Sequence, residues 1–263
     1  MAVADAKGRK FDAATGIAFA VVAVVGLALP GTPPKAKDSA EKIISFAAQH
    51  RSDILWSSFL FGIAAVLFLW FLGSLRSYLR AGEGGEGRLS AAAFGGGVAG
   101  IALLLGGAAI LNGIAFKIAG TTGADPSIAR GIFDASAAVV AMGSFGFAVL
   151  FGAASCSAAR SGALPPWAYW FGTLVTVAQV LTGLALVAKT GFFSVRQSFA
   201  ALVAFCVSCW SICCLFCLAC WETHLPYAFD LLLLVPYFSL NAAGSCACSA
   251  LHCFAALSCA TWS

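Results

Sequence analysis

The chain has 263 residues, of which 61% are hydrophobic and only 10% are charged, and its mean hydropathy is +0.93. Soluble domains carry about 25% charged residues, so this composition excludes an ordinary soluble protein and predicts a surface covered by lipid. The net charge of +4 comes from single Lys and Arg residues between apolar runs, without a basic block. We therefore expect the lipid bilayer as a partner and no nucleic acid.

Continuous apolar runs of about twenty residues predict an all-α fold, a polytopic transmembrane helix bundle of about six spans. This bundle takes up residues 1–220, and residues 221–263 form an apolar, Cys-rich tail. The first run follows basic residues, as in a signal peptide, but the absence of a small-x-small cleavage site favours an uncleaved span. The predicted spans are residues 13–30, 54–75, 91–118, 132–155, 167–188 and 198–220.

The insert between the first two spans is polar and predicts a short amphipathic helix. Asp38 and Glu41 have the spacing of a capping box, and Ile43, Phe46 and Ala47 share one helical face. We expect this helix to lie with its apolar face on the membrane surface. A substrate lid is the functional alternative.

The second span, Ile54–Leu75, has the clearest membrane pattern because it carries no charge. Its length of about 33 Å is enough to cross a hydrocarbon core of about 30 Å. Trp56 and Trp70 lie near its ends, and Arg76 and Arg80 follow one helical turn apart. Lys and Arg are divided almost equally between the two membrane sides, so the arginine cluster that begins here is what predicts a cytoplasmic N-terminus.

Glycines dominate the next segment. FGGGVAG contains the GxGxxG spacing at Gly95, Gly97 and Gly100, but it opens a membrane span, so we reject dinucleotide binding. Gly96 and Gly100 instead form a GxxxG pair that lets a neighbouring helix backbone approach closely. Such faces also predict contact with a second copy of the chain or with a membrane partner. The preceding EGGEG, from Glu83, is interpreted as a flexible turn.

Polar residues within spans three to five are the candidates for transport or for helix packing. A pair between Lys117 and Asp134 is geometrically plausible, because both lie towards the same membrane side. Thr173, Thr176 and Gln179 share a face that is expected to hydrogen-bond Asn112. Interhelical packing is the favoured interpretation and a permeation path the alternative. The candidates are Asn112, Lys117, Asp134 and Gln179.

The last predicted span is rich in cysteine, since ten of the eleven cysteines follow Phe205. Their spacing allows a metal or redox site, but within one apolar helix the ligands cannot fold back around an ion, so we expect no metal or cofactor. Two other interpretations stay open: cysteines serving as small hydrophobes, or a Leu/Val-rich helix read out of frame. The metal candidates are Cys206, Cys209, Cys214, Cys217, Cys220 and His224.

The run FLWFLGSLRSYLRAGEGGEGRLSAAAFGGGVAG, residues 68–100, resembles a group of uncharacterised integral membrane proteins common in actinobacteria. The insert KDSAEKIISFAAQHRSDIL, GFFS at 191–194 and LVAF at 202–205 fit the same pattern. The resemblance covers about residues 10–205 and implies an actinobacterial plasma membrane. It implies no activity.

We therefore predict an integral membrane protein with a non-catalytic structural or interaction role, because the chain lacks the motifs of a metalloprotease, serine hydrolase or phosphate loop. A small-solute transporter or channel is the alternative, based on the polar residues of spans three to five. A membrane redox or metal protein, based on the Cys-rich tail, is the third.

Overall fold

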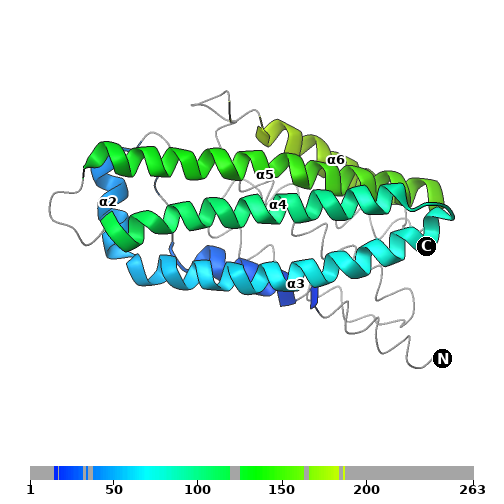
Figure 1. Cartoon of the computed structure of the whole chain (residues 1–263), viewed down its shortest axis with the longest axis horizontal. Coiled ribbons are helices and arrows are strands. Elements are labelled where there is room, and N and C mark those ends of the chain that lie inside the picture. Colours follow the sequence, from blue (N-terminus) through cyan, green and yellow to red (C-terminus); the bar gives the residue numbers. More distant parts are fainter. Residues whose placement is uncertain are drawn as a thin grey trace, which may run out of the picture. The chain divides into compact units, whose positions relative to one another are not determined.

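The computed structural model describes residues 15–16, 18–31, 34, 38–118, 125–162, 166–183 and 186. Every element in this part of the chain is helical and none is a strand, which confirms the all-α prediction. The labelled helices are shown in Figure 1, and a shorter apolar helix, Ala18–Ala28, precedes them. The elements are α2 Ala40–Gln49, α3 Arg51–Glu83, α4 Arg88–Gly113, the π-helix η1 Ile114–Ile118, α5 Pro126–Ser161 and α6 Pro166–Gly183, and Figure 1 labels all of them except η1.

Three of the described helices are long and apolar enough to cross a membrane: Arg51–Glu83, Arg88–Phe116 and Pro126–Ser161. They lie where spans 54–75, 91–118 and 132–155 were predicted. α6 occupies the place of the predicted fifth span with 18 residues. The predicted sixth span and the tail lie outside the described residues.

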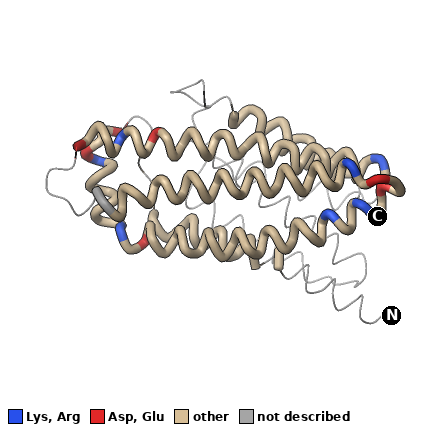
Figure 2. Tube along the Cα trace, in the orientation of Figure 1, with Lys and Arg blue, Asp and Glu red and all other residues tan. Residues whose placement is uncertain are grey.

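Charged residues gather at both ends of α3 and α5 and at the start of α4, as Figure 2 shows. α4 carries Arg88 as its sole charged residue. Between the charged ends, large apolar side chains face outwards: Val66 is 65% exposed, Trp70 59% and Trp170 67%. Monomeric soluble proteins rarely expose so much contiguous apolar surface, whereas lipid covers it without cost. This pattern supports a protein embedded in a membrane.

The main core forms where α3, α4, α5 and α6 pack together. Phe68, Phe71 and Leu72 of α3 are each about 2% exposed or less, and Phe151 of α5 is fully buried. Phe68 meets Phe147 edge-on, with their ring centroids 6.2 Å apart. Aromatic rings from two helices thus interlock within the bundle.

The closest helix contact joins α4 to α5 through glycines. A Cβ built on Gly146 would lie 2.5 Å from the amide nitrogen of Gly100 and 2.8 Å from the carbonyl oxygen of Gly96. A Cβ on Gly96 would lie 2.7 Å from the carbonyl oxygen of Gly146. The predicted GxxxG packing is confirmed, and the helix that approaches is α5 of the same chain. We call Gly96, Gly100 and Gly146 the glycine seam.

The predicted amphipathic helix exists as α2, but two details of the prediction were wrong. Its N-cap is Ser39, whose side chain accepts a hydrogen bond from the amide of Lys42, so Asp38 does not cap it. Its apolar face is covered by protein: Ile43 and Ala47 are 2% and 4% exposed and pack with residues of α3, η1 and α5. Burial against the helix ends replaces the contact with lipid that the amphipathic pattern suggested.

Candidate functional site

Asn112 is held by α3 and not by α6 as the sequence suggested. Ser58 Oγ lies 2.8 Å from Asn112 Oδ1 and donates to it. Thr173 and Thr176 instead donate to carbonyl oxygens one turn back in α6, those of Tyr169 and Gly172. The expected bond between this face and Asn112 was therefore wrong.

The three remaining polar candidates lie in different elements: Lys117 in η1, Asp134 in the first turns of α5 and Gln179 in α6. Asp134 is 57% exposed and pairs with Arg130, one helical turn earlier, at 3.1 Å. The side chain of Lys117 lies outside the described residues, so its predicted pair with Asp134 stays a prediction. Exposed ion pairs of this kind contribute about 0–1 kcal/mol. Gln179 is buried in α6 with 5% exposure.

Replacing Asn112 with alanine tests whether this side chain joins helices or serves transport. We expect the free energy of unfolding to fall by about 0.6–1.7 kcal/mol, the value of a polar contact between membrane helices. The measurement is unfolding in mixed micelles with increasing dodecyl sulfate. Thr173→Ala is the control, since Thr173 is exposed and bonds within its own helix. Unchanged stability in Asn112→Ala would contradict a packing role.

The turn between α3 and α4 holds the most extensive polar network among the described residues. Glu83, the last residue of α3, accepts hydrogen bonds from the backbone amides of Leu89 and Ser90 at 3.2 and 2.6 Å. It also accepts one from Ser157 Oγ of α5 at 2.9 Å. A single carboxylate thus caps the N-terminus of α4 and connects three helices.

The local sequence explains why a distant residue provides this cap. The N-cap position of α4 is Gly87, which has no side chain to accept from the first amides. Gly84 and Gly87 both adopt left-handed φ values, 63° and 69°, which glycine tolerates without strain. The chain can therefore reverse within a few residues and return α4 to the carboxylate of Glu83. A turn interpreted as flexible is a defined structure.

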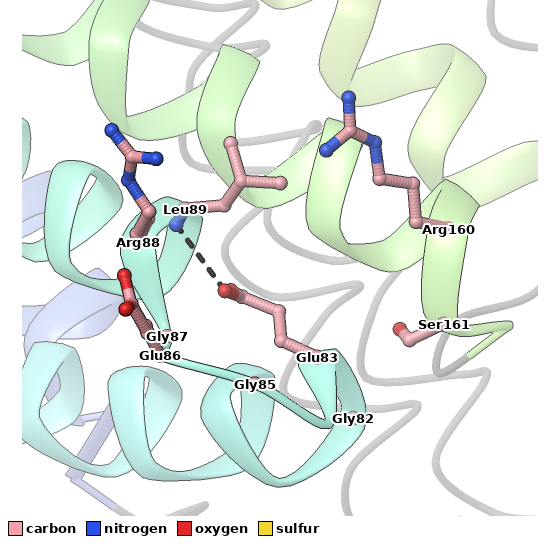
Figure 3. A pocket seen from close by; sticks show the side chains of 9 residues that line it. All are labelled: Gly82, Glu83, Gly85, Glu86, Gly87, Arg88, Leu89, Arg160 and Ser161. Carbon is pink, nitrogen blue, oxygen red and sulfur yellow. Dashed lines mark hydrogen bonds between the residues drawn. The ribbon is translucent and has the colours of Figure 1, made fainter.

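A pocket of about 230 Å³ opens beside this turn, between the ends of α3, α4 and α5 (Figure 3). Its glycines leave backbone exposed, and Arg88 and Arg160 stand on either side of Glu83 in Figure 3. Neither arginine has an ion-pair partner among the described residues.

The sequence analysis did not predict this site. The sequence signal for it is the helix start RLS, which follows a glycine and therefore has no capping side chain next to it. The lining residues are Gly82, Glu83, Gly85, Glu86, Gly87, Arg88, Leu89, Arg160 and Ser161.

At the opposite end of the bundle, the carboxylate of Asp125 caps α5 locally. The side chain and backbone of Ser127 both donate to Asp125, the N-cap of α5, and these bonds hold the pKa of Asp125 below its usual value. The stabilisation is therefore present above the ordinary aspartate pKa and is lost as the pH falls through the lowered one. Arg130 donates to the backbone oxygen of Asp38 at 2.8 Å, which ties α5 to the start of α2.

The metal candidates cannot be placed, because Cys206 to Cys220 and His224 lie outside the described residues. Within the described part, no three metal-binding side chains come together. Cys156, on α5, is exposed and free.

Comparisons of the chain with protein-family models, with curated proteins and with solved structures find no match.

Proposed function

We propose that this chain is a multi-pass protein of the plasma membrane with about six spans and a non-catalytic structural or interaction role. The observation that carries the proposal is how the described bundle uses its polar and small residues. The glycine seam brings α4 and α5 into backbone contact, and Asn112 is paired with Ser58. These residues hold helices together, as expected of a scaffold within the membrane.

The network around Glu83 supports the same role. It joins the end of α3 to the start of α4 and to α5. An end whose three helices are joined by hydrogen bonds favours a fixed assembly over a moving gate. Because α4 uses its glycine seam within the chain, a second copy or membrane partner would bind another face. The resemblance to actinobacterial membrane proteins suggests the plasma membrane as its location.

We further propose that the turn at residues 84–87 faces the cytoplasm, which puts the N-terminus on that side as well. Arg76, Arg80 and Arg88 lie at or next to this turn, and Arg160 ends α5 nearby. Basic residues near short loops favour the cytoplasmic side.

The orientation predicts where an antibody can reach the full-length protein. An epitope inserted at Gly85 should be inaccessible on intact spheroplasts and become accessible after the membrane is permeabilised, whereas one inserted before Asp125 should be accessible on both. Both positions lie outside the described helices, so the insertions should not break a span. The reverse labelling pattern would refute the orientation but not the membrane location.

Reconstituted vesicles separate the structural role from transport. A scaffold should leave the proton and potassium permeability of proteoliposomes at the level of protein-free vesicles. A leak that Asp134→Asn or Asn112→Ala abolishes would instead support the transporter alternative. Arg51→Gln is the matched control, because Arg51 is exposed and lies at the same end as Asp134, where Ile54 and Phe133 share one apolar cluster.

A further inference from the structure

The end of the bundle at the turn 84–87 has an excess of positive charge, with four arginines against the two carboxylates of Glu83 and Glu86. Arg76, Arg80, Arg88 and Arg160 are exposed and lack an ion-pair partner among the described residues. The guanidinium carbon of Arg76 instead lies 5.4 Å from the ring centroid of Phe94. Four cations at one end of a membrane bundle attract anions from the adjoining surface.

Glu83 lies among these arginines but forms no ion pair with any of them. Its two oxygens accept from Leu89, Ser90 and Ser157, so they are directed into the protein. Glu86 also lines the pocket, and it is exposed. Arg88 and Arg160 therefore keep their guanidinium donors available at the wall of a pocket of about 230 Å³.

The position of the pocket favours an anion that is attached to a lipid over one that is free in solution. It lies at the ends of α3, α4 and α5, directly beyond their apolar lengths. Tyr169 and Trp170, which is 67% exposed, lie near the start of α6, and such aromatic pairs mark the headgroup level. A phosphate placed here would still be attached to a lipid whose chains lie along the exposed apolar helix faces.

We propose that the pocket between Arg88 and Arg160 binds the phosphate group of an anionic phospholipid. The guanidinium groups donate to the phosphate oxygens in the planar, forked geometry that favours phosphate. The glycines at 82, 85 and 87 leave the headgroup room to enter. The inference rests on the proposed membrane location, and it adds a ligand class to a site with no assigned ligand.

Titration of the purified full-length protein with phosphatidylglycerol, followed by native mass spectrometry in detergent, tests this proposal. The double variant Arg88→Gln/Arg160→Gln should bind this lipid at least about tenfold more weakly, because it loses hydrogen bonds between charged groups that Arg76 does not make. Phosphatidylcholine should bind equally weakly to both proteins. Glu86→Gln should bind phosphatidylglycerol more tightly, because an opposing charge is removed from the pocket wall.

Arg76→Gln is the matched control, since Arg76 lies at the same end but does not line the pocket. It should change the affinity by less than about twofold. An equal loss of lipid affinity in Arg76→Gln and in the double variant would overturn the proposal, because it would indicate a general electrostatic attraction at this end. Unchanged lipid affinity of the double variant would overturn it as well. If the double variant unfolds, the proposal is tested by the expected gain of lipid affinity in Glu86→Gln and the expected loss of lipid affinity in Arg160→Gln.

Two further experiments test whether the phosphate belongs to a lipid or is free, and whether the protein lies in the membrane. Inorganic phosphate at millimolar concentration should not displace the lipid; displacement would assign the pocket to free phosphate and overturn the lipid. Extraction of the protein from cell membranes by alkaline carbonate alone would overturn the membrane location itself. A protein that stays with the membrane but ignores phosphatidylglycerol would overturn the lipid site alone.

Discussion

Replacing Gly146 with alanine is expected to lower the free energy of unfolding by about 1–3 kcal/mol, the cost of overpacking a close contact. The added methyl group would meet the backbone of Gly96 and Gly100, with the nearest atom at 2.5 Å. No side chain can rotate away, so α4 and α5 would have to separate along their length. Unfolding in mixed micelles, followed by tryptophan fluorescence, measures the loss.

Gly131→Ala is the control for this substitution, because it lies in the same helix and its new Cβ would have nothing within 4 Å. Alanine is the better helix former by about 1 kcal/mol, so this variant should be as stable as the parent or more stable. Equal effects of the two substitutions would show that the glycine seam is not a close contact. Gly96→Ala combined with Gly146→Ala should cost less than the sum, because either methyl group already separates the helices.

Replacing Glu83 with alanine is expected to lower the free energy of unfolding by about 2–3 kcal/mol, since hydrogen bonds to a charged group contribute about 1.5–3 kcal/mol. The loss leaves the amide of Ser90 and the hydroxyl of Ser157 without their acceptor, and both residues are fully buried. Glu83→Gln keeps one acceptor oxygen and should lose about half as much. The measurement is again unfolding in mixed micelles.

The matched control for Glu83 is Glu86→Gln, in the same turn. Glu86 is exposed and forms no hydrogen bond or ion pair with the other described residues. Its substitution should change stability by less than about 0.5 kcal/mol. A double-mutant cycle of Glu83→Gln with Ser157→Ala should give a coupling of about 0.5–3 kcal/mol, whereas strict additivity would contradict direct contact.

Glu83 shows what sequence patterns miss at a helix start. Capping is predicted from the residues next to the first turn, and Gly87 offers no side chain there. The acceptor comes from six and seven residues earlier, because α3 ends at that position and the turn is short. Only the path of the chain through the turn shows that the first amides of α4 come back within hydrogen-bonding distance of the Glu83 carboxylate.

The apolar pattern by itself determined that the described part of this chain is helical and where its long helices lie. Within lipid, every backbone amide and carbonyl must be satisfied inside its own segment, so an uncharged run of this length has little choice but a helix. The GxxxG spacing of Gly96 and Gly100 likewise predicted a close helix contact from local sequence alone.

Tertiary structure alone decided which residues meet. Ser58 rather than α6 holds Asn112, Gly146 is the partner of the glycine seam, and helix ends rather than lipid cover Ile43 of α2. These choices depend on the rotation and axial position of each helix relative to its neighbours. A pattern within one helix shows which face is apolar or small, but it carries no information on which neighbour will lie against that face.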